Sequence, residues 1–412
     1  MTLKQRHDCR LCHGEGLIPV LELTPTPPAN AFVTEAERHH PQPCYPLTLM
    51  FCPTCHHLQL QEVLDAATLF RHYLYVSGTS PAFVRHFTRY ADQLRGLAAL
   101  EAGALVVEIG SNDGTMLRRF RQHGCRVVGV DPAIEIGREA TASGIPTITA
   151  FFTRSVAAGI VEREGKARCI VANNVLAHVD DLDEILHGVR LLLADDGLFA
   201  FEVSWFADVI DHCLFDTIYH EHLDYHTVAP LRRFLRRHEM ELVGALPQQS
   251  HGGSIRCLVR HRRSAGEIDA SVAQAIARER SLGLDRPETI RAFGRHIDAA
   301  GARLQQLLAG LTQKGRRIIA YGAPAKATTL MYHFDIDSPT IEAIIDDNPR
   351  KQGRYSPGKH LPIVDASILE HDPPDCILIL AWNFAEAIME KLAAFRAGGG
   401  RILVPLPQPR LI

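Results

Sequence analysis

The sequence predicts an α/β protein in which a small cysteine-containing module precedes two Rossmann-like, doubly wound units. A short apolar strand, a glycine turn and a helix follow one another over residues 105–123, and further strands recur to about residue 203. A second strand and glycine turn begin at Arg317. Five of the ten cysteines lie within the first 55 residues. Strands that alternate with helices build a parallel sheet covered on both faces.

The composition is that of an ordinary globular protein. The chain has 412 residues, of which 46% are hydrophobic and 22% charged, and this length suits two to four domains. The net charge of -3 argues against a general attraction to nucleic acid or anionic membrane. The N-terminus lacks the apolar core of a signal peptide, and no apolar run approaches the roughly 18–20 residues that span a bilayer. We therefore expect a soluble, cytoplasmic protein without nucleic-acid or membrane partners, and a monomer is compatible with the sequence.

Two cysteine pairs stand out in the first module, Cys9-x-x-Cys12 and Cys52-x-x-Cys55. Four thiolates at tetrahedral positions suit Zn²⁺, and a closed four-sulfur site is structural. The spacer between the pairs, about 40 residues, is longer than in the commonest zinc ribbons. Ordinary reduced core cysteines, or a site in which Cys44 or His13 replaces one ligand, are therefore alternatives. We expect residues 1–65 to form a zinc-binding module.

The rest of the chain divides near residue 265. Residues from about 66 to 100 are expected to be helical because Phe83, Phe87, Tyr90 and Leu94 follow helical spacing. With the strands that follow, they predict a domain over residues 66–265. Residues 266–412 are expected to form linker helices, broken near Gly283 and Pro287, and a C-terminal Rossmann-like domain. Its strands are expected to start near residues 317, 341, 376 and 401.

The first glycine turn, Glu108-x-Gly110-x-x-x-Gly114, predicts a methyl-donor site. Gly110 permits close approach of a ligand to the backbone, and Asp131 ends the next strand, where an acidic side chain binds ribose hydroxyls. A dinucleotide site would favour G-x-G-x-x-G, whereas this turn carries Asn112 and Asp113, which suit the cationic methionine end of S-adenosylmethionine. A dinucleotide site and a turn without ligand are the alternatives. The expected cofactor-binding residues are Glu108, Gly110, Asn112, Asp113, Asp131, Pro132, Asn173 and Asn174.

A second group of polar residues, the histidine-rich stretch over residues 215–226, predicts acid–base chemistry. Histidine titrates near neutral pH and serves as a general base, and a neighbouring Tyr219 or Glu221 can orient it or stabilise an oxyanion. His178 lies close to the end of an expected strand. Surface or capping roles are the alternative. His222 and His226 have a metal-binding spacing, but the H-E-x-x-H pattern is absent, so we do not expect a metal here.

Taken together, these motifs resemble the sugar C-methyltransferases that act on nucleotide-linked 4-keto-deoxysugars. The resemblance covers nearly the whole chain. It implies a zinc-binding N-terminal domain, a central S-adenosylmethionine domain, and a C-terminal Rossmann-like domain that helps hold the nucleotide sugar, expected to be dTDP-linked. It also implies methylation at C3. The ordered motifs lie at residues 9–12, 52–55, 73–80, 108–114, 173–178, 219–222, 251–256, 321–326 and 347–353.

The chemistry implied by the resemblance is coherent. A ketone at C4 acidifies the C3 proton, a base removes it, and the enolate carbon attacks the sulfonium methyl group. The resemblance gives His222 as the base, supported by Tyr219, Glu221 and His178, with Tyr75, or else Tyr73, closing the pocket. A methyltransferase acting on another carbon or on oxygen, and a non-catalytic nucleotide-sugar-binding protein, are the alternatives.

Further residues are expected to hold the substrate. Arg256, next to a glycine pair, can contact a phosphate or carboxylate, and two lysines of the C-terminal domain can meet a diphosphate. Pro324 departs from the small residue common in family turns and stiffens the second glycine turn. The expected substrate-binding residues are Tyr73, Ser77, His251, Arg256, Tyr321, Lys326, Asn348, Lys351, Trp382 and Asn383.

Overall fold

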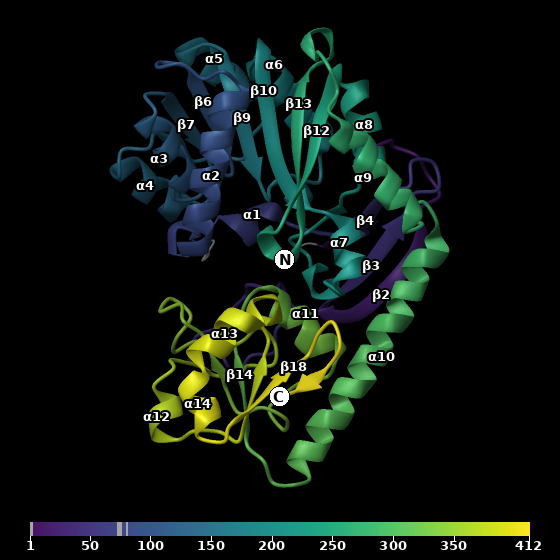
Figure 1. Ribbon diagram of the computed structural model, residues 1–412, viewed down its shortest axis with the longest axis vertical. Coiled ribbons are helices and arrows are strands. Elements are labelled where there is room, and N and C mark those ends of the chain that lie inside the picture. Colours follow the sequence, from purple (N-terminus) through teal and green to yellow (C-terminus); the bar gives the residue numbers. More distant parts are fainter. Residues whose placement is uncertain (1–2, 72–75, 80) are drawn as a thin grey trace.

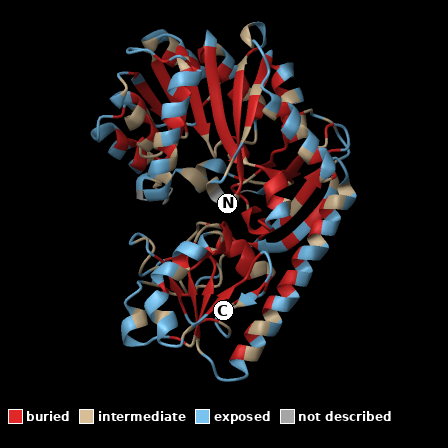
Figure 2. Cartoon of the chain, viewed as in Figure 1, coloured by how far each residue is buried: buried red, intermediate tan, exposed pale blue. Residues whose placement is uncertain are grey.

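The structure, a computed structural model, describes residues 3–71, 76–79 and 81–412. A seven-stranded sheet forms the central unit and a six-stranded sheet the C-terminal unit, while a four-stranded sheet from the N-terminal module lies beside both (Figure 1). The strands of each unit are buried beneath exposed helix faces (Figure 2). Within the described residues, no helix is both long and apolar enough to cross a membrane.

The N-terminal sheet is antiparallel and is completed by a strand from elsewhere in the chain. Its order is β11-β4-β3-β2, and β11 (Asp224–Tyr225) comes from the central unit. The module predicted over residues 1–65 is therefore joined to the histidine-rich stretch through a shared sheet. The remaining strands are β1 (Leu3–Gln5), β2 (Ile18–Thr26), β3 (Tyr45–Phe51), β4 (Leu58–Leu60) and β5 (Glu62–Leu64), of which β1 and β5 pair separately.

The central sheet has the order β12-β13-β10-β9-β6-β7-β8. The predicted parallel strands are confirmed as β6, β7, β9 and β10, and β8 adds a parallel strand that was not predicted. β13 pairs antiparallel with both of its neighbours. From β6 the strands β7 and β8 are added on one side of the sheet, and β9 and β10 on the other. Open α/β sheets bind ligands at such a switch point, here between β6 and β9. The strands are β6 (Leu105–Ile109), β7 (Arg126–Val130), β8 (Thr147–Ile148), β9 (Ala167–Asn173), β10 (Leu193–Ser204), β12 (Met240–Gln248) and β13 (Ser254–His261).

Helices cover both faces of this sheet. On one face the predicted helical residues Phe87, Tyr90 and Leu94 of α2 pack on the sheet beside α3. Burying a side chain of this size contributes about 1.5–3 kcal/mol. The opposite face is covered by α5, α6 and α8. The helices are α1 (Ala66–Phe70), α2 (Pro81–Leu97), α3 (Thr115–Gln122), α4 (Ile134–Ala142), α5 (Arg154–Glu164), α6 (Leu182–Leu192), α7 (Phe206–Asp211) and α8 (Val228–Arg237).

Two helices, α9 (Ala270–Ser281) and α10 (Pro287–Thr312), connect the central unit to the C-terminal unit. The predicted break is confirmed, since Gly283 has a φ of +68° and Pro287 opens α10. α10 runs past β2 towards the C-terminal unit (Figure 1). A Cβ on Gly301 would lie 2.7 Å from the Phe334 ring, so glycine permits this helix to pack closely there.

The C-terminal sheet has the order β16-β15-β14-β17-β18-β19 and is parallel except for β19. The predicted fold class, with two Rossmann-like units, is therefore confirmed. The strands are β14 (Ile318–Tyr321), β15 (Ile344–Ile345), β16 (Ile363–Val364), β17 (Cys376–Ile379), β18 (Arg401–Val404) and β19 (Arg410–Leu411). The helices are α11 (Lys326–His333), α12 (Ile368–His371), α13 (Ala385–Lys391) and α14 (Ala393–Ala397).

Candidate active site

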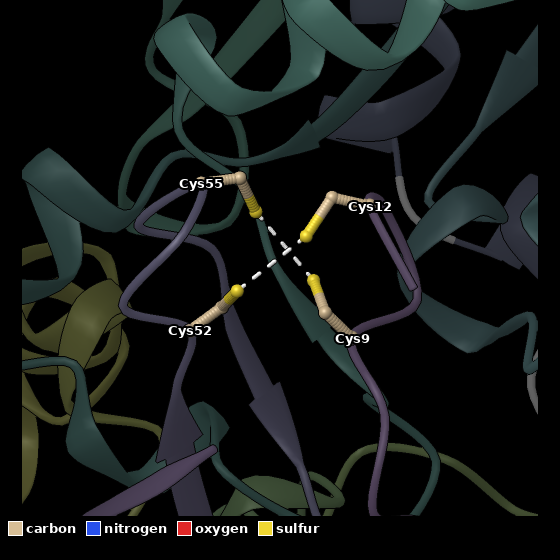
Figure 3. A group of neighbouring side chains, drawn as sticks. All are labelled: Cys9, Cys12, Cys52 and Cys55. Carbon is tan, nitrogen blue, oxygen red and sulfur yellow. Dashed lines mark hydrogen bonds between the residues drawn. The ribbon is translucent and has the colours of Figure 1, made fainter. Parts of the chain in front are cut away.

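The four paired cysteines converge on one point (Figure 3). Their Sγ atoms all lie within 4.8 Å of one another, and the Cys9–Cys55 and Cys12–Cys52 separations are both 3.5 Å. Sulfur ligands about 2.3 Å from a tetrahedral zinc ion are about 3.8 Å apart, so the arrangement fits Zn²⁺. Neither alternative ligand belongs to this group: Cys44 is exposed, and the His13 Nε2 lies 2.8 Å from an Asp183 carboxylate oxygen.

The two cysteine pairs lie in two separate turns that have the same backbone conformation. The His13 N–H donates to the Cys9 carbonyl and the His56 N–H to the Cys52 carbonyl, each at 2.8 Å. Both histidines have left-handed backbone, with φ of 57° and 65°. This turn aims the two sulfurs of a pair towards the same side of the loop. The equivalence of the two halves supports a symmetric four-sulfur site over four unrelated core cysteines.

The glycine turn after β6 lies against the end of β7. A Cβ on Gly110, whose φ is +68°, would lie 2.3 Å from a Val175 methyl carbon, so only glycine fits. The Asp131 carboxylate accepts from the Asn112 and Ala133 N–H groups, both at 2.8 Å. Burial raises the pKa of Asp131. A carboxylate has about four acceptor positions, so two remain for ribose hydroxyls.

Unpaired buried polar atoms gather near this turn. Within the described part of the chain, Glu108 Oε2, Ser111 Oγ and Asn173 Oδ1 have no hydrogen-bond partner. The other Glu108 oxygen accepts from the Asn173 amide at 3.3 Å, and burial raises the pKa of Glu108. Glu108 and Asn173 lie near the carboxyl ends of the neighbouring strands β6 and β9. Buried polar atoms require a partner, and the ammonium and hydroxyl groups of S-adenosylmethionine fit this set.

The remaining predicted cofactor residues lie around the same turn. Asp113 accepts from the Thr115 N–H at 3.2 Å and pairs with Arg118 at 3.3 Å, so it stabilises the start of α3. The Asn112 side-chain oxygen accepts from the Ser77 N–H at 2.9 Å, which brings residues 77–79 over the turn. Asn174 follows β9, and Pro132 follows Asp131 directly.

His222 is held in one tautomer by the hydrogen bonds of its two ring nitrogens. Nδ1 lies 2.8 Å from the Thr217 carbonyl oxygen, and Nε2 lies 3.1 Å from the Tyr219 hydroxyl. Because a carbonyl only accepts, Nδ1 carries the proton and Nε2 accepts from Tyr219. Burial lowers the pKa of His222 to about 4 and raises the pKa of Tyr219 well above 10. At neutral pH, His222 is therefore an uncharged imidazole with its basic nitrogen facing a phenol.

His178 lies against His222 and close in sequence to the end of β9. It ends the short helix Leu176–His178, just after Asn174, and its ring centroid lies 4.9 Å from that of His222 in an edge-to-face arrangement. Glu221 is 2% exposed, and its Oε1 accepts from the Asn30 amide at 2.8 Å. Asn30 was not predicted, because it lies 191 residues away in the N-terminal module. Of the other predicted residues, Tyr73, Tyr75 and the side chain of His251 lie outside the described residues.

Three cations predicted to meet substrate are held by the protein itself. The Arg256 guanidinium lies 2.5 Å from a Glu202 carboxylate oxygen and 3.4 Å from the Tyr90 ring centroid. Lys326 lies 3.4 Å from Asp216. The Lys351 ammonium donates to the Ala323 carbonyl at 2.8 Å and lies 3.7 Å from Asp346. Phosphate binding at the two lysines would therefore require exchange of these partners.

The C-terminal glycine turn repeats a contact of the first. Asp346 follows β15 and accepts from the Ala323 N–H at 2.7 Å and the Asn348 N–H at 2.9 Å, as Asp131 does after β7. Asp346 was not predicted, although an acidic residue directly after the second strand of such a unit is a recognisable sequence signal. Tyr321 donates to Asp347 at 2.8 Å. In the described part of the chain, the buried Oδ1 of Asn383 has no partner, which fits a substrate contact.

Comparison with known proteins covers all three parts of the chain. Residues 9–70 match the family described as "Putative zinc binding domain", residues 83–244 match "Methyltransferase domain", and residues 249–407 match "C-methyltransferase C-terminal domain". The chain is 34% identical over 405 residues to the C-methyltransferase NovU of Streptomyces niveus, covering 98% of this chain and 96% of that protein.

Solved methyltransferase structures resemble about half of the chain. Magnesium protoporphyrin IX methyltransferase from Synechocystis PCC 6803 with bound SAM is 16% identical, with a TM-score of 0.35, over 48% of this chain and 98% of that one. A Burkholderia thailandensis 1,6-didemethyltoxoflavin-N1-methyltransferase is 17% identical, with a TM-score of 0.32, over 50% of this chain and 95% of that one. The match to NovU, which extends through all three units, decides the family: the chain belongs to the C-methyltransferases, enzymes that depend on S-adenosylmethionine, and carries a structural zinc site.

Proposed function

We propose that this enzyme transfers a methyl group from S-adenosylmethionine to C3 of a nucleotide-linked 4-keto-deoxysugar. The nucleotide in this proposal is dTDP. The observation that carries the proposal is the neutral His222, whose Nδ1 proton is held by Thr217 and whose Nε2 is an acceptor. Methylation of carbon requires a carbon nucleophile, and an uncharged imidazole beside a phenol suits proton removal next to a ketone.

In this mechanism, the C4 ketone acidifies the C3–H bond. His222 Nε2 takes the C3 proton, the C–H electrons form the enolate, and Tyr219 turns its hydrogen bond from Nε2 to the enolate oxygen. An imidazole with a pKa of about 4 is a weak base, so this oxyanion stabilisation must lower the barrier. S-adenosylmethionine supplies the electrophilic methyl group that C3 attacks. His222 then releases its proton to solvent.

In this proposal, the residues that position the substrate lie on both sides of the histidine-rich stretch. Ser77 lies beside the glycine turn, while Asn383 and Trp382 lie in the C-terminal unit. A Cβ on Gly252 would lie 3.8 Å from the Asn383 Cβ, so the loop that precedes β13, the strand that carries Arg256, approaches Asn383. This approach supports a shared sugar-binding region between the central and C-terminal units.

The test is incubation of the zinc-loaded enzyme with S-adenosylmethionine and a small panel of nucleotide-linked 4-keto-deoxysugars. We expect a product heavier by one methyl group, and NMR of that product to place the methyl on C3. Both C3 and C5 flank a C4 ketone, so a methyl group found on C5 or on oxygen would overturn the proposal that C3 is the carbon methylated. Failure to methylate any panel member would overturn the sugar assignment.

A second experiment tests the base without methyl transfer. In D2O and without the methyl donor, the wild-type enzyme should exchange the C3 proton for deuterium, and His222→Ala should not. An oxygen methyltransferase has no need of an enolate and would show no exchange. Exchange that persists in His222→Ala would assign proton removal to another group.

A further inference from the structure

We infer that Asn30, from the zinc-binding module, is a positioning residue for methyl transfer that acts by holding the carboxylate of Glu221, the residue that precedes His222 in the sequence. This inference rests on the proposed function of the histidine-rich stretch. The Asn30 Nδ2 donates to Glu221 Oε1 at 2.8 Å across 191 residues of sequence. An amide donor favours the charged form of a buried carboxylate and fixes its direction.

The backbone on both sides of Glu221 is already fixed. The His220 ring lies 3.0 Å from the Pro46 carbonyl oxygen, and the His222 ring bonds the Thr217 carbonyl at 2.8 Å. Leu223 donates its N–H to the Ala177 carbonyl at 2.6 Å, and its own carbonyl accepts from Leu60 at 2.8 Å. With the backbone held, the direction of the Glu221 side chain depends on side-chain contacts, and Asn30 supplies one.

Asn30 is itself fixed in a loop, residues 27–33, that we call the bridging loop. The Ala29 carbonyl accepts from the Thr328 hydroxyl of α11 at 3.1 Å, and the Lys351 ammonium lies 5.3 Å from the Phe32 ring centroid. Val33 pairs with Tyr355 through two backbone hydrogen bonds of 3.1 and 2.9 Å. The loop is thus anchored on the C-terminal unit while Asn30 reaches the central unit.

The bridging loop gives the contact a role beyond fixing a side chain. Its neighbours Thr328 and Lys351 belong to the unit expected to bind the nucleotide sugar, and its start, after β2, belongs to the zinc-binding module. Through Asn30, the direction of the Glu221 carboxylate therefore depends on how the three units are placed relative to one another. An alternative is that Asn30 is only a structural tie between units, and the experiment separates the two roles.

The experiment is a double-mutant cycle with Asn30→Ala, Glu221→Gln and the two combined. If Asn30 acts through Glu221, Asn30→Ala should lower kcat about 10-fold or more in the wild-type background, leave the KM for S-adenosylmethionine nearly unchanged, and cause no further loss in Glu221→Gln. Asn30→Asp places a second carboxylate against the first, so the acid limb of the kcat–pH profile should move to higher pH.

Gln42→Ala is the matched control. Gln42 donates to the Ala31 carbonyl at 2.9 Å, so its loss loosens the same loop without touching Glu221. Zinc content and the unfolding midpoint of each variant are measured alongside. Equal losses in Asn30→Ala and Gln42→Ala, or losses that multiply in the double variant, would reduce Asn30 to a structural tie. The cycle is run with whichever carbon acceptor the wild type methylates, so failure with nucleotide sugars rejects the substrate proposal separately.

Discussion

At the scale of single residues, the site depends on which histidines are uncharged. His220, His222 and His226 all lie in the segment between Phe215 and Thr227, and burial lowers the pKa of each to about 4. Only His222 among them has both a fixed proton and a ring nitrogen facing Tyr219. His220 bonds a backbone carbonyl, and His226 lies against Asp224 and His57. His222, the proposed base, is thus distinguished by its hydrogen bonds and by its neighbours, because the pKa is lowered alike in all three histidines.

The first prediction concerns His222. In His222→Ala, kcat should fall roughly 10²–10⁴-fold, the range that a positioned general base contributes. The dissociation constant for S-adenosylmethionine, measured by calorimetry, should change little, because the predicted cofactor residues lie around Gly110. Wild-type turnover by this variant would transfer the base role to another group. His178→Ala, which removes a supporting ring, serves as the comparison and should lose less.

The second prediction concerns pH. An unfolded histidine titrates near pH 6.5, whereas these three titrate near 4 when folded. Between these values the unfolded chain binds protons that the folded chain does not, so the histidine contribution is complete above pH 6.5 and is lost as pH falls towards 4. The two buried histidines, His220 and His226, each account for about 3 kcal/mol at most.

Urea denaturation at pH 7 and pH 5 measures this loss. Glu108 and Asp216, whose pKa values burial raises, change stability in the opposite direction. Comparison with His226→Gln therefore isolates one histidine: the variant should lose less stability than the wild type between pH 7 and pH 5. An equal loss would show that His226 is not held neutral in the folded protein.

At the scale of elements, β11 explains why the zinc-binding module matters to the central unit. This strand pairs with β4, the His57 ring lies 2.7 Å from the Asp224 carboxylate, and Arg10 donates to the Leu223 carbonyl at 3.2 Å. The zinc-binding module therefore packs directly against the segment that carries His222. Its zinc ligands and its contacts with that segment lie on the same short loops.

The third prediction is that loss of zinc abolishes activity as well as the fold of the module. Structural zinc binding is worth about 10–16 kcal/mol in zinc-finger peptides, which is more than a small module can replace. Chelation, or Cys52→Ser, should release one zinc per chain by elemental analysis, open residues 3–65 to proteolysis and lower kcat. Cys44→Ser is the control, because Cys44 is exposed and outside the cluster. Full activity in zinc-free enzyme would show that the pairing of β11 with the zinc-binding module is not needed to hold the segment that carries His222.

Sequence alone predicted the elements built from neighbouring residues. The Cys-x-x-Cys turns, the Gly110 turn and the break before Pro287 are local patterns, and each lies where it was expected. The contacts that complete the site are not local. β11 is a two-residue strand whose partner lies 165 or more residues away, and the charges of Arg256 and Lys326 are satisfied by Glu202 and Asp216. No pattern within a short window specifies such a partner.

At the scale of the whole molecule, the central and C-terminal units meet through a buried ionic contact as well as through α10. Asp216 is fully buried, accepts from the Trp382 indole N–H at 2.6 Å and lies 3.4 Å from the Lys326 ammonium. That ammonium lies 4.2 Å from the Trp382 ring centroid. Nearby, the Thr329 hydroxyl donates to the Ile218 carbonyl at 2.9 Å. The contact lies within the stretch that carries His222, so it bears on the placement of both units and of the proposed base.

The last prediction follows from the cost of leaving one buried charge alone. Burial raises the pKa of Asp216 and lowers that of Lys326, so each charge depends on its partner. Removing one partner of a buried ion pair costs about 3–5 kcal/mol, whereas replacing both with apolar groups is often neutral. Asp216→Leu should therefore lower the free energy of unfolding by about that amount, and adding Lys326→Met should recover much of it.

Urea denaturation of the two single variants and the double variant measures this coupling, and the kinetics of the same variants separate stability from substrate binding. If Lys326 leaves Asp216 to contact the diphosphate of the proposed nucleotide-sugar substrate, the stable double variant should still show a raised KM for that substrate, with little change in the KM for S-adenosylmethionine. Additive losses of stability would show that the two charges are independent. An unchanged KM for the nucleotide sugar would mean that Lys326 serves only to join the units, because a cation that meets the diphosphate cannot be replaced by methionine without weakening that contact.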